Sequence, residues 1–100
     1  LYTCDHFVYP EFKLGNIMQT PLGELAWSEQ ATQFGNDKRD TLTAQCQRCE
    51  FRFACNGGCP KHRILTSKDG DPGHNYFCES YTMFFKHAGE RLRAIATRLA

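Results

Sequence analysis

The sequence predicts a small α+β domain that is organised by bound metal, and three observations support this fold class. A chain of 100 residues can bury only a modest apolar core. Apolar side chains recur at helical intervals in the last part of the chain. Before them, five of the six cysteines follow one another in one stretch, while Cys4 stands apart near the start: Cys46, Cys49, Cys55, Cys59 and Cys78.

The first predicted element is a β-hairpin over residues 6–17. His6–Tyr9 is rich in aromatic and β-branched residues, which favour strands, and Phe12–Leu14 would form the returning strand. Pro10-Glu11 offers the turn between the two strands, and Gly15-Asn16 would end the second one.

Two helices are predicted next. The first covers residues 21–27, where the apolar side chains share one side. The second begins after Ser28, which is a suitable N-cap, and reaches about residue 42, although Gly35-Asn36 could break it.

The rest of the chain is predicted to be a cysteine-rich loop, a polar loop and a long helix. Residues 43–63 should contain one helical turn over residues 51–54, because metal ligands dictate the backbone there. Residues 66–75 are rich in turn-forming residues. The last helix covers residues 79–99, and its apolar stripe would be core or a docking face: Tyr81, Phe84, Phe85, Ala88, Leu92, Ile95 and Leu99.

The cysteine pattern admits three interpretations. Disulfide frameworks belong to secreted domains, and no signal peptide precedes Leu1. Structural zinc commonly takes two Cys-x-x-Cys pairs, and Cys46/Cys49 is the single pair of that kind here. Iron–sulfur clusters take four thiolates with more varied spacings. The sequence therefore favours an iron–sulfur cluster, with zinc and disulfides as the alternatives.

Six thiolates fill one four-cysteine site and leave two. The remaining two are then structural, or the chain is part of a longer protein that supplies the missing ligands. Within the stretch, Gly57 and Gly58 permit positive φ and would let the backbone wrap closely around a cluster. A plain tight turn would use the same two glycines.

Charge and hydropathy exclude several classes of function. The net charge of +1 disfavours nucleic acid as a partner. No apolar run approaches the roughly 20 residues that a membrane span needs. Outside the last helix, basic residues gather only at Lys61–Arg63, where we expect a solvated face. Dense thiols without a secretion signal favour a reducing cytoplasm. The histidines have no metal-ligand spacing to one another and are expected to be surface or packing residues: His6, His62, His74 and His87.

The spacing of the cysteines from Cys46 to Cys78 resembles the C-terminal part of a SPASM domain. More narrowly, Tyr2–Asp5, Leu14–Ile17 and Cys55–Lys61 resemble the anaerobic sulfatase-maturating enzymes. The resemblance covers nearly all of residues 1–100, which are expected to form one auxiliary domain. Those enzymes use radical S-adenosylmethionine chemistry, and the resemblance implies auxiliary [4Fe–4S] clusters in this chain.

The resemblance also implies a set of ligands. Cys46, Cys49, Cys55 and Cys78 would hold one cluster, whereas Cys4 and Cys59 would belong to a second cluster whose other ligands lie upstream. Proximity in the sequence would instead place Cys59 in the first group. A recombinant fragment could hold zinc in place of a cluster, since thiolates accept both.

Asp5 is the one acid that the resemblance singles out. It would act as the base that takes a proton from the target residue during oxidation, and a carboxylate beside a cluster ligand suits that role. Without the family, Asp5 could equally cap the hairpin or accept a hydrogen bond from a nearby N–H.

The implied reaction oxidises a cysteine or serine of a sulfatase polypeptide to formylglycine. The Cys-x3-Cys-x2-Cys motif that binds the catalytic cluster and S-adenosylmethionine in these enzymes is absent from the chain. The chain alone is therefore not expected to be catalytic, and it would need an upstream radical domain and an electron acceptor. The alternatives are a SPASM module of another peptide-modifying radical enzyme, or a zinc-bound interaction domain without enzymatic activity.

Overall fold

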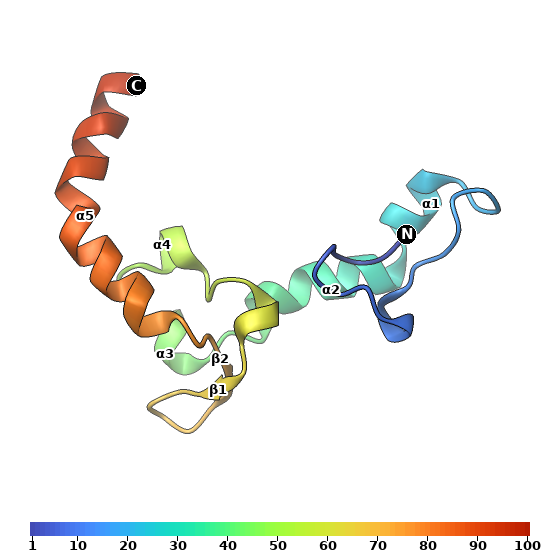
Figure 1. Ribbon diagram of the computed structural model, residues 1–100, viewed down its shortest axis with the longest axis horizontal. Coiled ribbons are helices and arrows are strands. Elements are labelled where there is room, and N and C mark those ends of the chain that lie inside the picture. Colours follow the sequence, from blue (N-terminus) through green and yellow to red (C-terminus); the bar gives the residue numbers. More distant parts are fainter. The chain divides into compact units, whose positions relative to one another are not determined.

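Short helices, a two-stranded antiparallel hairpin and a long C-terminal helix make up the chain, which confirms the α+β class (Figure 1). The computed structural model describes all of residues 1–100, which divide into two units, Leu1–Leu42 and Thr43–Ala100. No helix combines the length and the apolar character that crossing a membrane would require.

The first unit contains the 3-10 turn η1 (Pro10–Phe12) and the helices α1 (Leu22–Ala26) and α2 (Glu29–Asp40). The hairpin predicted over residues 6–17 does not form. Pro10 has no N–H for a strand ladder, and its fixed φ suits the start of a helical turn, so it begins η1.

The segment after η1 pairs with the N-terminus of the chain instead. The Thr3 N–H donates to the Phe12 carbonyl at 3.0 Å, and the Leu14 N–H donates to the Leu1 carbonyl at 2.8 Å. These bonds make a single isolated antiparallel bridge, between Tyr2 and Lys13, which is too short to count as a pair of strands.

Aromatic side chains that suggested strands pack on α2. The rings of Phe7 and Phe12 meet edge to face with their centroids 4.9 Å apart. Both rings also contact Phe34 of α2, at 5.4 and 5.9 Å. This cluster, together with the buried side chains of Leu25 and Leu42, forms the apolar interior of the first unit.

The helices predicted over residues 21–27 and 28–42 are confirmed with slightly shorter bounds. Ser28 caps α2, because its Oγ accepts a hydrogen bond from the Ala31 N–H at 3.2 Å. Gly35-Asn36 does not interrupt the helix, since a glycine inside an exposed helix costs only about 1 kcal/mol relative to alanine.

The second unit holds the cysteine-rich segment and the long helix. Its elements are α3 (Ala44–Gln47), α4 (Arg52–Cys55), the 3-10 turn η2 (Pro60–His62), β1 (Leu65–Thr66), β2 (Pro72–His74) and α5 (Cys78–Leu99). Helix α4 confirms the helical turn predicted over residues 51–54, whereas α3 was not predicted.

Strand β2 and the second residue of β1 lie in the segment that was predicted to be a polar loop, residues 66–75. Two pairs of opposite residues set their antiparallel register, Leu65–His74 and Thr66–Pro72. Gly73 is therefore an extra residue, and its φ of +81° is a left-handed conformation that glycine adopts without steric cost. The turn-forming residues build a short hairpin rather than an irregular loop.

The tip of this hairpin positions α3. The Ala44 N–H donates to the Asp71 carboxylate at 2.9 Å, and the Lys68 N–H donates to the Gln45 side-chain carbonyl at 2.9 Å. Because α3 carries Cys46, these bonds fix the place of one predicted ligand.

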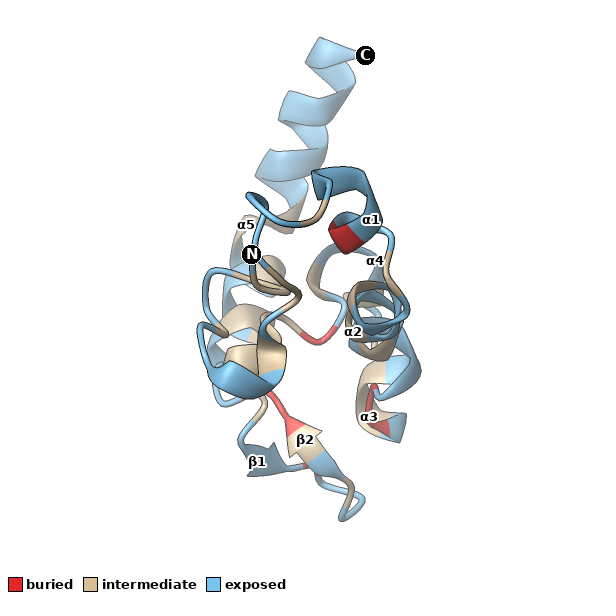
Figure 2. Ribbon diagram, turned by 90° about the vertical axis from the view of Figure 1, so that its right-hand side faces the viewer, coloured by how far each residue is buried: buried red, intermediate tan, exposed pale blue.

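Helix α5 confirms the long helix predicted over residues 79–99 and begins one residue earlier, at Cys78. The apolar stripe is not a core over most of its length. Phe84, Leu92 and Ile95 are 55%, 43% and 52% exposed. Figure 2 shows the C-terminal half of α5 in the colour of exposed residues.

Candidate metal centre

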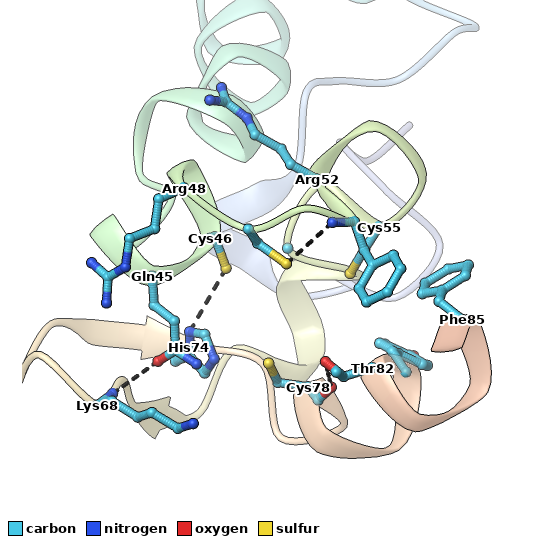
Figure 3. A pocket seen from close by; sticks show the side chains of 14 residues that line it. Gln45, Cys46, Arg48, Arg52, Cys55, Lys68, His74, Cys78, Thr82 and Phe85 are labelled. Carbon is cyan, nitrogen blue, oxygen red and sulfur yellow. Dashed lines mark hydrogen bonds between the residues drawn. The ribbon is translucent and has the colours of Figure 1, made fainter. Parts of the chain in front are cut away.

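Four cysteines line one cavity of about 330 Å³ in the second unit. Cys46 lies on α3, Cys55 ends α4, Cys78 begins α5, and Cys49 follows α3 in the turn before α4. Figure 3 shows the sulfur atoms of Cys46, Cys55 and Cys78 around a common space. None of the six cysteines forms a disulfide, so the disulfide framework is not realised in the structure.

Aromatic rings form one wall of this cavity. Phe51 stacks on Phe85 with the ring centroids 5.4 Å apart, and Tyr81 lines the cavity beside them. The stems of Arg48 and Arg52 also line it, but their guanidinium groups point away from it in Figure 3. The surroundings of the sulfurs are therefore largely apolar.

Burial raises the pKa of the Cys78 thiol, and the neighbouring Cys46 thiol raises that pKa further. Four thiolates at one partly buried place would repel one another, so they need a cation between them. A coordinated metal reverses this preference because it deprotonates the thiols that bind it. Four sulfurs around one cavity fit an iron–sulfur cubane, whereas no three of them lie within 4.8 Å of one another, as the ligands of a single zinc ion would.

The loop after α4 confirms the positive φ angles predicted for its two glycines. Asn56, Gly57 and Gly58 have φ of 45°, 78° and 64°. Successive residues of this conformation can turn their N–H groups toward an anion, but here the N–H groups of Asn56 and Gly58 already donate to the carbonyls of Arg52 and Cys55, at 2.9 and 2.8 Å. Gly57 is buried and lines the cavity, so the backbone approaches the place of the four sulfurs closely.

Arg63 holds this loop from its carbonyl side. Its guanidinium donates to the carbonyls of Asn56, Gly57 and Gly58 at 3.1, 3.3 and 3.1 Å. The prediction of a solvated face is therefore wrong for Arg63. Asn75, which is 2% exposed, also donates to the Gly57 carbonyl, at 3.2 Å. In a trans peptide the N–H points opposite to the C=O, so these bonds turn the loop's amides away from Arg63.

His74 is a residue of the centre that the sequence reasoning missed. It was expected to be a surface or packing residue, but it is 5% exposed and lines the cavity. Its Nδ1 lies 3.0 Å from the Thr43 Oγ1 and 3.7 Å from the Cys46 Sγ (Figure 3). The signal that could have found it is its position four residues before Cys78.

The other predicted site residues lie elsewhere. Cys59 follows the glycine loop and is not among the residues that line the cavity. Cys4 and Asp5 belong to the first unit, and together with His6 they place one potential ligand atom each within 4.8 Å of one another.

Asp5 is exposed to solvent. The Cys4 thiol donates to its carboxylate at 3.3 Å, and this bond, followed by the charge of His6, lowers the pKa of Asp5. The carboxylate is therefore ionised at neutral pH. The alternative role as a hairpin cap does not apply, because the hairpin that it would cap is not formed. The other alternative is confirmed, since the carboxylate accepts hydrogen bonds from the backbone N–H groups of Asp5 and His6.

The chain matches a family model and two groups of known proteins. Residues 1–50 match SPASM, an iron–sulfur cluster-binding domain. Over 87 residues the chain is 51% identical to the serine-type anaerobic sulfatase-maturating enzyme of Bacteroides thetaiotaomicron. The matched region is 87% of this chain and 21% of that protein. Over 99 residues it is 31% identical to the cysteine-type enzyme of Clostridium perfringens, and the matched region is 99% of this chain and 26% of that protein.

The fold is also similar to that of a solved structure, "Native anSMEcpe with bound AdoMet and Cp18Cys peptide". The TM-score is 0.76 at 29% identity, over 99% of this chain and 27% of that one. The chain thus spans about a quarter of the length of the proteins that it matches, 21% and 26% for the two enzymes above.

Proposed function

This chain belongs to the SPASM family of iron–sulfur cluster-binding domains, and from this premise we propose that it is the auxiliary cluster domain of an anaerobic sulfatase-maturating enzyme. The complete enzyme would oxidise a residue of a sulfatase polypeptide to formylglycine, with S-adenosylmethionine bound by a radical domain outside this chain. The 51% identity to a serine-type enzyme supports serine as the target residue. The dense thiols suit a reducing cytoplasm.

One observation carries the assignment of ligands. Cys46, Cys49, Cys55 and Cys78 line the same cavity, and Cys59 does not line it. This supports a [4Fe–4S] cluster on those four cysteines rather than on the four that are nearest in the sequence. Cys4 and Cys59 would then contribute to a second cluster, together with ligands from outside the chain. A bound cluster would supply one-electron transfer to an external acceptor.

Asp5 would accept the proton that the oxidation releases. Converting the CH₂OH group of serine to an aldehyde removes two hydrogens. One leaves as a hydrogen atom to the radical formed outside this chain, and the other leaves as a proton while its electron passes to the clusters. An exposed carboxylate beside Cys4 suits the proton transfer, because both the substrate and the second cluster would lie next to it.

The ligand assignment is tested by two cysteine variants of the 100-residue chain. After anaerobic reconstitution, the wild-type chain should hold about four irons and four sulfides and show a broad absorbance that a reductant bleaches. Cys78→Ala removes a sulfur from the cavity and should abolish cluster binding. Cys59→Ala is the matched control and should largely retain iron, because its sulfur lies outside the cavity's lining.

The opposite pattern, with iron lost in Cys59→Ala and retained in Cys78→Ala, would support the grouping by proximity in the sequence. A colourless wild-type chain that binds one zinc tightly and takes up no iron would overturn the proposed cluster. Iron content and absorbance should be measured on the same samples, so that zinc bound by the same thiols is recognised.

A further inference from the structure

We propose that His74 is a positioning residue for Cys46, and that its Nδ1–H donates a hydrogen bond to the Cys46 sulfur and raises the reduction potential of the bound cluster. This inference rests on the proposed function, because it requires a cluster on the four cysteines of the cavity. It concerns a residue that touches a ligand rather than the substrate.

The position of the imidazole is fixed by the fold. His74 ends β2, where it pairs with Leu65, and its side chain is 5% exposed. Cys46 stands on α3, which the hairpin tip holds through the bond from Ala44 to Asp71 at 2.9 Å. The ring and the sulfur therefore belong to elements that are tied together, which favours a lasting contact at 3.7 Å.

Thr43 completes the arrangement. Its hydroxyl oxygen accepts a hydrogen bond from the Cys46 N–H at 3.2 Å, which caps α3, and it lies 3.0 Å from the His74 Nδ1. Thr43 is itself 3% exposed, so water does not compete freely for these atoms. One buried hydroxyl thus holds both the backbone of the ligand residue and the imidazole beside its sulfur.

The surroundings of the ring select the tautomer that can donate to sulfur. The Nε2 of His74 is buried and has no hydrogen-bond partner, whereas Nδ1 faces two acceptors, the Thr43 oxygen and the Cys46 sulfur. A proton on Nε2 would be a buried donor without an acceptor, and buried N–H groups of that kind are rare. A proton on Nδ1 can be shared by both acceptors. It leaves the Nε2 lone pair and the Thr43 hydroxyl hydrogen unused, and a hydroxyl can rotate toward another acceptor whereas a ring N–H cannot.

A hydrogen bond to a ligating sulfur changes how easily a cluster is reduced. Reduction adds negative charge that is partly carried by the sulfur ligands, so a donor to sulfur stabilises the reduced state more than the oxidised state. Hydrogen bonds to the sulfurs are among the factors that set the reduction potentials of such clusters. Loss of the His74 donor should therefore lower the potential.

The test compares His74→Asn with His74→Leu in the reconstituted 100-residue chain. The two side chains have the same shape, but the asparagine amide places a donor near the position of Nδ1 and the leucine does not. At a fixed ambient potential near the wild-type midpoint, the ratio of reduced to oxidised cluster should fall about tenfold in His74→Leu, which is 59 mV for one electron. It should stay close to the wild-type ratio in His74→Asn.

His62→Leu is the matched control. His62 is half-buried, with its ring centroid 5.1 Å from that of Phe77, but it does not line the cavity, so its replacement should leave the ratio unchanged. His74→Gln adds a second comparison if the leucine variant loses iron. The glutamine amide reaches the position of Nε2 rather than Nδ1, so its cluster should be harder to reduce than that of His74→Asn.

The outcomes separate this inference from the proposed function. A wild-type chain without iron overturns both. Iron in every variant with equal reduction potentials overturns the inference alone. An equal fall of the potential in His74→Asn and His74→Leu also overturns it, because the donor that asparagine retains would then make no difference. Loss of iron in all three His74 variants would show that the whole imidazole is required to hold the metal, which overturns a role confined to one hydrogen bond.

Discussion

Asp5 lies next to Cys4, which is a proposed cluster ligand. Its carboxylate is exposed, so a substrate can reach it and give up a proton to it. In the complete enzyme, Asp5→Asn keeps the shape but removes the basic oxygen, and formylglycine formation should fall about 10²–10⁴-fold in a peptide assay. Iron content and uncoupled cleavage of S-adenosylmethionine should remain, because neither depends on this carboxylate.

Glu11→Gln is the control for this prediction, since Glu11 is another exposed acid of the first unit and has no expected role in the reaction. Normal turnover in Asp5→Asn with intact clusters would exclude Asp5 as an essential base. A parallel loss of iron and activity would instead show that Asp5 supports the ligand Cys4.

At the residue scale, the sequence identifies groups whose chemistry belongs to the residue type. Cysteines in close succession predict metal ligands, and the structure places four of them around one cavity. The roles of His74 and Arg63 could not be predicted in that way. Each depends on which atom the fold brings to the side chain, a sulfur for His74 and three carbonyls for Arg63.

At the scale of elements, the loop Asn56–Gly58 offers a direct test of the hydrogen bonds that Arg63 and Asn75 donate to its carbonyls. Gly58 has φ of +64°, and an added Cβ would come within 2.5 Å of the Asn75 amide nitrogen. Gly70 has φ of +88°, but an added Cβ would meet nothing within 4 Å. Both alanine variants carry left-handed strain of about 1–2 kcal/mol, and Gly58→Ala must also displace Asn75.

Gly58→Ala should therefore lower the free energy of unfolding more than Gly70→Ala does, by at least about 1 kcal/mol for the disturbed hydrogen bonds. It should also lower the iron content, whereas Gly70→Ala should not. Denaturant titration and iron analysis measure the two effects. Equal losses in the two variants would mean that the Asn75 contact does not stabilise the loop.

Helices α1, α2 and α5 were predictable because their signals are local, whereas α3 was not predicted. Ser28 caps α2 as its position suggested, and a period of 3.6 residues marks α5. The strands were not predictable in the same way. The bulge at Gly73 and the bonds between the hairpin tip and α3 depend on contacts between segments. The aromatic residues near the N-terminus suggested a hairpin but serve the packing on Phe34.

For the whole molecule, the interior of the second unit differs in kind from that of the first. The buried apolar side chains, Leu25 and Leu42, both belong to the first unit. The buried side chains of the second unit are polar and surround the cavity or its supports: Thr43, Ser67, His74 and Asn75. A unit without an apolar interior gains little stability from the hydrophobic effect, so bound metal should supply much of it.

Metal removal should therefore loosen the second unit selectively. When the reconstituted 100-residue chain is stripped of iron with an anaerobic chelator, backbone amides of α3 and α4 should exchange hydrogen at least about tenfold faster. Both helices carry proposed ligands, and both are too short to persist alone. Amides of α2 serve as the internal control and should change little, since the first unit has its own cap and aromatic cluster. Hydrogen exchange followed by mass spectrometry resolves these segments. The Cys78→Ala chain should show fast exchange in α3 and α4 before any treatment, since it cannot complete the ligand set. Uniform acceleration in both units, or none in either, would contradict the view that the metal is the core of the second unit alone.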